Sequence, residues 1–288
     1  MKELVIISGK GGTGKTSIVA AFASLARSKV LCDADVDAAD LHLILDPDIK
    51  ERHDFQSGHT AEIHLDRCTR CGLCRDLCQW NAISDEFVVD PVDCEGCGVC
   101  YDFCPEDAIE FPLNTCGEWY LSDTRFGPMA HGRLGIAEEN SGKLVTLIRQ
   151  QGRQLAEDKN LDLLLTDGPP GIGCPVIASI GGATAVLIVA EPSVSGRHDL
   201  ERVGELAAFF KIPALVCINK FDLNPEAGQG IETYAQEKNI GVMGRIPFDP
   251  AFTRAMVQGR NILEFDRRCE GSVAVGRIWE KLAREFDI

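Results

Sequence analysis

A glycine-rich octapeptide near the start of the chain is the feature that most constrains its fold. Residues 9–16 read Gly-Lys-Gly-Gly-Thr-Gly-Lys-Thr and match G-x-x-x-x-G-K-[ST] at every position. The apolar run Glu3–Ile7 before them predicts a buried strand, and the alanine-rich run Thr16–Arg27 after them predicts a helix. This order of strand, loop and helix predicts backbone N–H groups that bind phosphate, assisted by the helix dipole.

Strand and helix patterns alternate along most of the remaining chain. Further strands are expected at Lys29–Cys32, Leu161–Thr166, Ala185–Val189, Ala214–Ile218 and Gly241–Ile246, with helices such as Arg197–Phe210 between them. Buried apolar strands that alternate with helices predict the α/β class, with a mostly parallel P-loop NTPase sheet covered by helices on both faces.

A cysteine-rich block interrupts this alternation. The composition changes abruptly after residue 62, and the block ends near Pro112. A chain of 288 residues can hold one large domain and a small insertion. We therefore expect one domain made of residues 1–62 and 113–288, and an inserted small α+β domain of residues 63–112.

Eight cysteines of this block form two sets, each with the spacing C-x2-C-x2-C-x3-C. This is the spacing of bacterial ferredoxins, in which three cysteines hold one 4Fe-4S cluster and the fourth ligates the other cluster. It predicts one cluster on each of two crossed sets: Cys68, Cys71, Cys74 and Cys104; and Cys78, Cys94, Cys97 and Cys100. Zinc is the alternative, since repeated C-x2-C is also zinc spacing. Four thiolates at this spacing, present twice, favour the clusters.

Composition excludes several classes of function. The formal net charge is -15, which would repel a nucleic-acid backbone, and no basic patch stands out. No signal peptide and no apolar run of membrane-spanning length are evident, so we expect a cytoplasmic protein without stable membrane insertion. In that compartment the 13 cysteines are expected to be metal ligands or free thiols.

The second lysine of the loop, Lys10, adds a resemblance to a known family. The segment KGGTGKT that it begins is similar to the deviant P-loop of the MinD, ParA and nitrogenase iron-protein ATPases. The chain resembles this group over nearly its whole length. It looks in particular like the MinD-superfamily ATPases that carry an inserted ferredoxin domain. The resemblance implies a nucleotide-sandwiched dimer in which Lys10 reaches the partner's phosphates. A solvated loop lysine is the alternative.

Motif and resemblance together imply the chemistry of the nucleotide site. Lys15 is expected to reach the β- and γ-phosphates, and Asp35 to position or activate the attacking water. Asp33 and Asp37 are expected to be solvated, and Asp40 to cap a helix. The expected catalytic residues are Lys10, Lys15 and Asp35, and the expected magnesium ligands are Thr16, Asp35 and, through water, Asp167. The expected phosphate-binding residues are Gly9, Lys10, Gly11, Gly12, Thr13, Gly14, Lys15, Thr16 and Ser17.

Two later segments are candidates for recognition of the base. Asn219-Lys220-Phe221-Asp222 resembles the N-K-x-D motif, whose aspartate reads guanine in GTPases. In the MinD relatives the asparagine contacts adenine, and a Pro-x-Asp turn, here Pro247-Phe248-Asp249, packs near the base. The resemblance favours ATP, and the residues alone leave GTP open.

The remaining cysteines and the histidines give weaker signals. Cys32 and Cys217 lie in apolar strands and are expected to be small buried hydrophobes. Cys174 stands where nitrogenase-type iron proteins place a cluster ligand, with Cys116 as the nearest upstream partner, so a packed thiol and a cluster role both stay open. For His131, the alternatives are the nucleotide-dependent interface and simple packing.

These observations predict a dimeric, Mg-dependent ATPase that couples its nucleotide state to electron transfer through two 4Fe-4S clusters. A similar ATPase in a homodimer or heterodimer, and a redox or small metal-binding protein, are the expected partners. The alternatives are a metallocluster assembly or insertion ATPase and a nucleotide-switched scaffold. The last is disfavoured because Val275–Phe286 mixes acidic and basic residues, unlike a basic membrane helix.

Overall fold

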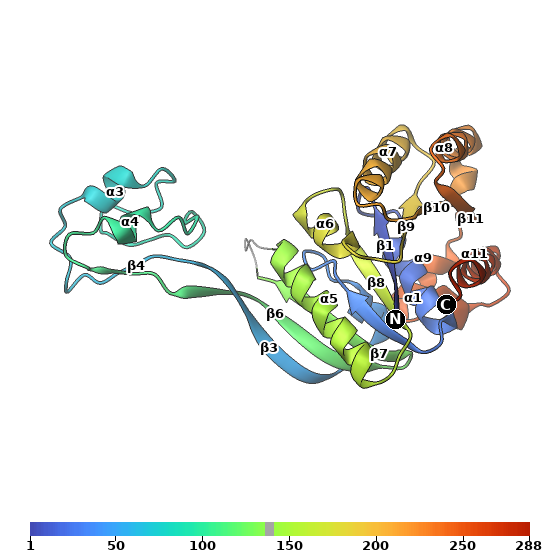
Figure 1. The fold of residues 1–288 in the computed structure, drawn as a ribbon, viewed down its shortest axis with the longest axis horizontal. Helices are drawn as coiled ribbons and strands as arrows, with labels where there is room; N and C mark the ends of the chain where they lie inside the picture. Colours follow the sequence, from blue (N-terminus) through green and yellow to red (C-terminus); the bar gives the residue numbers. More distant parts are fainter. Residues whose placement is uncertain (136–140) are drawn as a thin grey trace. The chain divides into compact units, whose positions relative to one another are not determined.

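The computed structural model describes residues 1–135 and 141–288, which divide into two compact units. Unit 1 comprises residues 1–53, 119–133 and 141–288 (Figure 1). Unit 2 comprises residues 54–118 and a short segment that begins at Leu134. The second unit is thus wider on both sides than the expected insertion of residues 63–112. The difference arises because two long strands, β3 (Asp48–His59) and β6 (Leu113–Thr124), lead into and out of it.

A nine-stranded sheet in the order β11-β10-β9-β1-β8-β2-β7-β6-β3 organises unit 1. The strands of its centre pair in parallel, as predicted. Their bounds are β1 (Lys2–Ser8), β2 (Lys29–Asp33), β7 (Gly127–Leu134), β8 (Leu163–Pro170), β9 (Ala185–Ala190), β10 (Ala214–Asn219) and β11 (Gly241–Ile246). The mostly parallel α/β architecture is therefore confirmed.

Apolar side chains on both faces of the sheet explain why helices cover both sides of it. Successive residues of β1 point to opposite faces, so Leu4 and Ile6 join one core while Val5 and Ile7 join the other. The first core is covered by α1 (Lys15–Leu25), α2 (Leu41–Leu45), α9 (Ala251–Val257), α10 (Ile262–Phe265) and α11 (Glu270–Phe286). The second core is covered by α6 (Cys174–Ile180), α7 (Val194–Phe209) and α8 (Pro225–Glu237).

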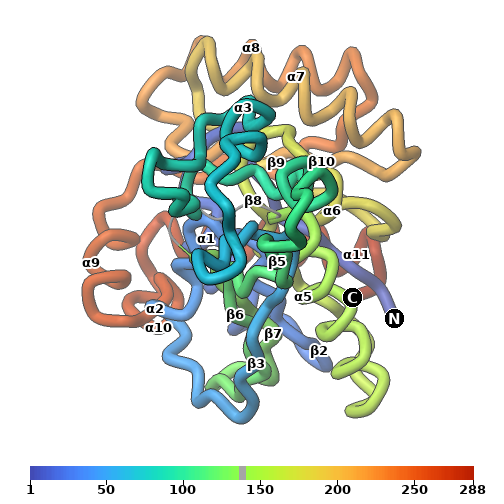
Figure 2. The backbone as a smooth tube through the Cα atoms, turned by 90° about the vertical axis from the view of Figure 1, so that its left-hand side faces the viewer, coloured from blue at the N-terminus to red at the C-terminus, as the bar shows by residue number. Residues whose placement is uncertain are grey.

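Three further features complete unit 1. Helix α5 (Ser141–Asp158) packs against α6 and β2, and the short 3-10 helix η1 (Phe221–Leu223) follows β10. In Figure 2, α2, α9 and α10 lie close to one another on one side of the unit. Helix α11 buries Val275, Ile278 and Leu282, as expected for a packed helix. No helix within the described ranges is long and apolar enough to cross a membrane.

Unit 2 has little regular structure and a small apolar core. It contains α3 (Leu73–Leu77), α4 (Val99–Asp102) and an antiparallel pair formed by β4 (Glu62–Ile63) and β5 (Ile109–Glu110). Its buried apolar side chains are Phe55, Ala61, Ala82, Ile83, Phe87, Ala108, Ile109 and Cys116. So small a core contributes little hydrophobic stabilisation, and units of this size usually depend on bound metal or cross-links.

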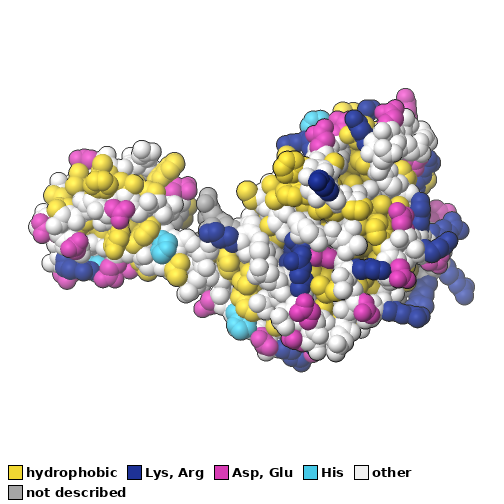
Figure 3. All heavy atoms as spheres, viewed as in Figure 1, with side chains coloured by type: hydrophobic (Ala, Val, Ile, Leu, Met, Phe, Trp, Pro, Cys, Tyr) yellow, Lys and Arg dark blue, Asp and Glu magenta, His cyan; other side chains and the backbone are white. Residues whose placement is uncertain are grey.

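Most of the chain's net negative charge comes from unit 2. Residues 54–118 include fourteen Asp and Glu, three Arg and no Lys, so their formal charge is -11 of the total of -15. Acidic side chains are spread over the visible face of this unit in Figure 3. The rest of the chain carries only -4, so an anionic ligand at unit 1 meets little long-range repulsion from its own unit.

Candidate functional site

A cavity of about 630 Å³ opens at the carboxyl ends of the parallel strands of unit 1. Its polar end is formed by the glycine loop after β1, by Asp35 after β2 and by Asn219 at the end of β10. The other end is apolar and includes Phe252 and Met256 of α9. Ligands of open α/β sheets bind at this edge, and the volume is that of a small-molecule site.

The glycine loop is braced by two residues that were expected to contact the base. The Nδ2 of Asn219 donates to the Thr13 carbonyl at 2.7 Å, and its Oδ1 accepts the backbone N–H of Lys220. The Nζ of Lys220 donates to the Gly12 carbonyl at 2.9 Å. Gly14 has φ +90°, and a Cβ there would lie 2.5 Å from the Asn219 amide. The Asn219 amide thus fixes the glycine loop while Asn219 also lines the cavity, and its contact with adenine stays a prediction.

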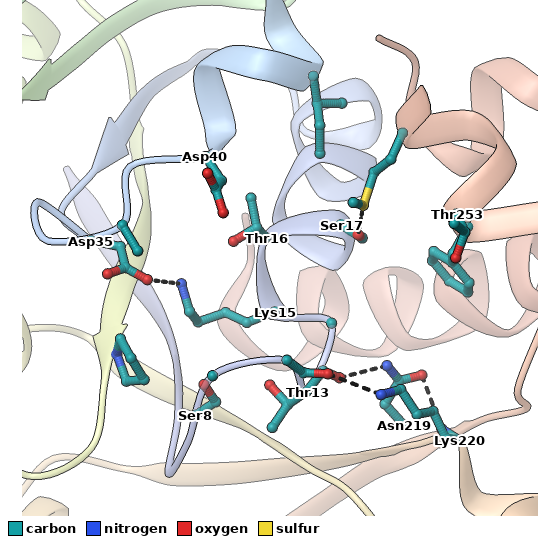
Figure 4. A pocket seen from close by; sticks show the side chains of 18 of the residues that line it. Ser8, Thr13, Lys15, Thr16, Ser17, Asp35, Asp40, Asn219, Lys220 and Thr253 are labelled. Atoms are coloured by element: carbon teal, nitrogen blue, oxygen red, sulfur yellow. Dashed lines mark hydrogen bonds and ion pairs between the residues drawn. The ribbon is translucent and has the colours of Figure 1, made fainter. Parts of the chain in front are cut away.

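A buried cluster of charges surrounds the end of Lys15. Its Nζ donates to Asp167 Oδ1 at 2.5 Å and to Asp35 Oδ2 at 3.2 Å, and Figure 4 shows the Asp35 carboxylate turned toward it. Burial alone would lower the pKa of Lys15, but the charges of Asp167 and Asp35 outweigh burial and raise it. Burial raises the pKa of Asp35, and the Lys15 charge opposes this rise. The structure therefore brings together three of the residues that the motifs predicted.

One oxygen of this cluster lacks a partner. Asp167 Oδ2 is buried and accepts no hydrogen bond from any described residue. Buried carboxylate oxygens normally have a donor or a cation beside them. Thr16 lines the same cavity, so a hydrated magnesium ion fits the donors present, which are one hydroxyl and carboxylate oxygens.

Two aspartates of the run after β2 differ from expectation. Asp33 was expected to be solvated, yet it is buried, and its carboxylate accepts the backbone N–H groups of Asp35 and Leu41. Burial, followed by the charge of Asp167, raises its pKa well above the usual value. Asp40 was expected to cap α2 but makes no side-chain cap bond; it lines the cavity instead. Asp33 therefore shapes the loop, and Asp40 is an additional candidate ligand.

The first two residues of the glycine loop lie outside the cavity lining. A Cβ on Gly9 would overlap the side chain of Asp199 on α7. The Nζ of Lys10 forms an ion pair with Glu191 and donates to Ser195 Oγ at 3.0 Å. Lys10 therefore does not line this cavity; Glu191 after β9 and Ser195 of α7 hold its side chain, which is 39% exposed.

The apolar end of the cavity is shaped by the segment 247–249 and by α9. Pro247, Phe248 and Asp249 line it, and Asp249 accepts the backbone N–H groups of Ala251 and Gly271, so its carboxylate anchors the turn. Asp222, the last residue of N-K-F-D, accepts the Phe248 N–H at 2.6 Å and does not line the cavity. The carboxylate that would read guanine is thus committed to the protein backbone.

Eight of the nine cysteines of unit 2 line two separate cavities, four to each. The first cavity is lined by Cys68, Cys71, Cys74 and Cys104. The second cavity is lined by Cys78, Cys94, Cys97 and Cys100. Each cavity thus takes three cysteines from one motif and the fourth from the other. This is the crossed partition that the spacing predicts. Within the described ranges, no group of three or more His, Cys, Asp or Glu side chains is arranged to hold a single metal ion.

The two cysteine loops have the same local backbone. Gly72 and Gly98 both have positive φ, of 86° and 77°, and each directly precedes a short helix. Backbone N–H groups of Arg70 and Ala108 donate to the sulfurs of Cys68 and Cys104, both at 3.4 Å. Donation to sulfur is the contact by which proteins stabilise thiolates and tune clusters.

Burial disfavours the thiolate at one cysteine of each set. It raises the pKa of Cys74, and it raises the pKa of Cys100 to about 11. A cation at the sulfur would reverse this preference, because coordination deprotonates a thiol outright. All thirteen cysteines of the chain are free. The four sulfurs of each cavity are soft donors, which suit iron–sulfur clusters or zinc; one glutamate, Glu106 or Glu95, also lines each cavity.

The other cysteines and His131 fall into plain roles. Cys32 and Cys217 are fully buried in strands, as predicted. Cys116 is buried in unit 2 and its thiol faces backbone carbonyls of β3, whereas Cys174 is exposed at the start of α6 in unit 1. His131 is buried in β7, stacked on Tyr120 and hydrogen-bonded to Ser122. Burial and the charge of His42 lower its pKa to about 4.

Comparison with known proteins agrees with this geometry. The model of the CobQ/CobB/MinD/ParA nucleotide binding domain matches residues 4–262. The uncharacterized protein MJ0578 of Methanocaldococcus jannaschii is 34% identical over 291 residues, which cover 99% of this chain and 97% of that protein. The cell division ATPase MinD of Pyrococcus furiosus has a TM-score of 0.60 at 18% identity, with 99% of both chains covered. The septum site-determining protein MinD of Pyrococcus horikoshii, complexed with Mg-ADP, has a TM-score of 0.61 at 17% identity, covering 99% and 97% of the two chains.

Proposed function

We propose a function for this chain on the premise that it belongs to the CobQ/CobB/MinD/ParA nucleotide-binding family. As a nucleotide-binding P-loop ATPase of the MinD/ParA type, it hydrolyses ATP with magnesium at the cavity of unit 1. Unit 2 is a ferredoxin-like insertion that holds two 4Fe-4S clusters. The nucleotide state controls electron transfer through these clusters toward a partner redox or metal protein.

The charge cluster at Lys15 supports the hydrolytic part of this proposal. Asp35 and Asp167 neutralise the Lys15 ammonium. A triphosphate in the loop supplies competing anionic oxygens to Lys15, which frees Asp35 to orient a water molecule. Thr16 and the unpartnered oxygen of Asp167 then hold hydrated magnesium beside the phosphates. Positioning of this kind, more than covalent chemistry, is what phosphoryl transfer requires.

The base end of the cavity supports ATP over GTP. Guanine recognition by an N-K-x-D motif needs a free aspartate, and Asp222 is bound to the Phe248 N–H. The remaining lining at this end is mostly apolar, with Leu43, Phe252 and Val257 exposed to the cavity. An apolar slot accepts the face of adenine without a dedicated carboxylate. The related MinD of Pyrococcus horikoshii was likewise found with Mg-ADP.

The partition of the eight cysteines into two cavities is the single observation that carries the iron–sulfur part. Each cavity is lined by four cysteines and one glutamate, Glu106 in the first and Glu95 in the second, so four of the five metal-binding side chains are sulfur donors. Cys68, Cys71, Cys74 and Cys104 would hold one cluster, and Cys78, Cys94, Cys97 and Cys100 the other. A bound 4Fe-4S cluster supplies reversible one-electron transfer at low potential. The chain's own part is to present the thiolates, donate N–H groups to two of them and surround them with apolar side chains.

The dimer and its partners follow from the family resemblance. Lys10 does not line its own cavity, so its expected contact is with the phosphates of a second subunit, either another copy of this chain or a similar ATPase. An assembly ATPase that delivers metalloclusters has the same residues and is tested by the stability of the clusters. A scaffold role like that of MinD leaves the cysteine cavities of unit 2 without a purpose.

A single preparation tests the proposal. Protein purified without oxygen should contain about eight irons and eight sulfides per chain and hydrolyse Mg-ATP. Cys74→Ser and Cys100→Ser should each lose about half of the iron, because each removes one ligand of one cubane. Cys269→Ser, outside both cavities, is the matched control and should lose none.

Other results separate the two halves of the proposal. Stoichiometric zinc without visible absorption would exclude the clusters and leave the ATPase standing. Wild-type protein that contains the full amount of iron but hydrolyses no ATP, like the Asp35→Ala variant, would exclude the ATPase. Clusters that transfer to an apo-acceptor protein within a turnover would favour cluster delivery over electron transfer.

A further inference from the structure

Arg125 lies in the two-residue turn that joins β6 to β7, and its guanidinium uses every nitrogen. Its Nη1 donates to the Leu45 carbonyl at 2.8 Å, and its Nη2 donates to the Ile44 carbonyl at 2.7 Å. The same Nη2 also lies 3.1 Å from the Gly259 carbonyl. Nε and Nη2 contact both carboxylate oxygens of Glu264, at 2.7 and 2.8 Å. A planar fork of five N–H donors is the side chain suited to such a set.

The partners of Arg125 belong to two neighbouring segments that both line the nucleotide cavity and are called its two walls below. Ile44 is a lining residue on α2, as is its neighbour Leu43. Gly259 follows α9, whose residues Met256 and Val257 line the second wall, and a Cβ on Gly259 would lie 3.6 Å from the Leu43 carbonyl. One cation thus joins the helix that follows the Asp35 loop to the helix that closes the apolar end of the cavity.

Apolar packing holds both walls to the core, and Arg125 adds polar contacts between them. Helix α2 has only five residues, which is too short to be stable alone, and its last carbonyls need donors. A cation at its carboxyl end supplies both hydrogen bonds and a favourable dipole interaction. On the other side, Glu264 is fixed by a capping box with Asn261, so it gives Arg125 a rigid anchor. The hydrogen bonds with the Glu264 carboxylate raise the pKa of Arg125, so its guanidinium keeps its positive charge.

We propose that Arg125 is a positioning residue for the nucleotide, because it sets the separation of the two walls that hold base and ribose. The inference rests on the proposed assignment of this cavity to a nucleotide. Arg125 itself does not line the cavity, and it contacts none of the residues of the glycine loop. Its effect is therefore confined to the base end, and the phosphate end is independent of it.

Two probes distinguish the ends of the cavity. Mg-ATP uses both the glycine loop and the walls, whereas inorganic tripolyphosphate uses the loop alone. Arg125→Lys keeps the charge but loses the fork, and it should weaken Mg-ATP binding about tenfold while tripolyphosphate binding changes less than about twofold. KM for ATP should rise by a similar factor, and kcat should stay within about threefold, since Lys15 and Asp35 are untouched.

Arg260→Lys is the matched control. Arg260 is a nearby exposed arginine that donates to the Glu264 carbonyl but to nothing on α2. Its replacement should leave the affinities for both probes unchanged. Glu264→Gln removes the anchor without touching the α2 carbonyls, and should give an intermediate loss for ATP alone. This second variant keeps the test open if Arg125→Lys fails to fold.

The outcomes separate positioning from general stability. Equal losses for ATP and tripolyphosphate, or unchanged ATP affinity, would overturn the role of Arg125. Wild-type protein that binds tripolyphosphate but shows no preference for ATP over it would instead overturn the assignment of the apolar end to a base. A fall in unfolding free energy without a change in the ratio of the two affinities would show a purely structural clamp.

Discussion

Glu191 holds Lys10 within its own subunit, and we expect Glu191→Gln to favour the nucleotide-bound dimer. The Lys10 ammonium pairs with the Glu191 carboxylate, and the two side chains are 39% and 20% exposed. If Lys10 acts on the phosphates of a partner subunit, this pair must break each time a dimer closes. Weakening the pair therefore removes a cost of dimerisation and leaves the contact across the dimer intact.

The magnitude follows from the exposure of the pair. Ion pairs that are this accessible to water contribute about 0.2–1 kcal/mol. A symmetric dimer releases two Lys10 side chains, so the dimer should be favoured by about 0.4–2 kcal/mol, or about twofold to thirtyfold in its dissociation constant. The hydrogen bond from Lys10 to Ser195 is retained in the variant, which places the expected value in the lower half of this range.

Sedimentation velocity over a concentration series, with magnesium and a non-hydrolysable ATP analogue, measures this constant. Glu201→Gln is the matched control, because Glu201 lies on α7, the helix of Ser195, and pairs with Arg197 across one helical turn. The control should dimerise like the wild type. A Glu191→Gln dimer that is weaker than the wild type, or equal to it while Lys10→Ala abolishes dimerisation, would refute the idea that Glu191 restrains Lys10.

Two further expectations concern His131 and Asp222. The pKa of His131 is about 4 in the fold against about 6.5 unfolded, so the unfolded chain takes up the proton first and stability falls as pH drops from 6.5 toward 4. Denaturant unfolding at pH 7.5 and 5.5 should show the wild type losing about 1 kcal/mol more than His131→Gln; equal losses would contradict this. Asp222→Ala should weaken ATP and GTP by the same factor, about tenfold, because its carboxylate supports the Phe248 N–H. Equilibrium titration would contradict this if only GTP binding were lost.

Local patterns were sufficient wherever the chemistry depends on residues close in the chain. The glycine loop between a strand and a helix predicted β1, α1 and the phosphate end of the cavity, because the backbone geometry of such a loop is set by its own glycines. Apolar runs predicted the central strands β9, β10 and β11 within one or two residues. The spacing of the cysteines likewise predicted which thiols share a cavity, since three of each four lie on one short loop.

The edge of the sheet was not evident from sequence patterns. β3 is largely exposed and carries charged residues without the regular alternation of a half-buried strand, so β3 and its neighbour β6 gave no clear signal. Asp33 was likewise misjudged. An acidic run suggests solvation, whereas only the parallel pairing of β2 with β8 places Asp33 beside Asp167 in the interior.

The sequence by itself determined the family and the phosphate loop, which rest on one continuous motif, and it predicted the grouping of the cysteines from the ferredoxin spacing. Only the tertiary structure decided what holds those parts in place. Arg125 meets Leu45 across 80 residues, Lys10 meets Ser195 across 185, and Lys220 meets Gly12 across 208. No local sequence pattern predicts such contacts, because single arginine and lysine residues are common on protein surfaces. Their roles appear only when the fold brings distant backbone carbonyls and charges within hydrogen-bonding distance.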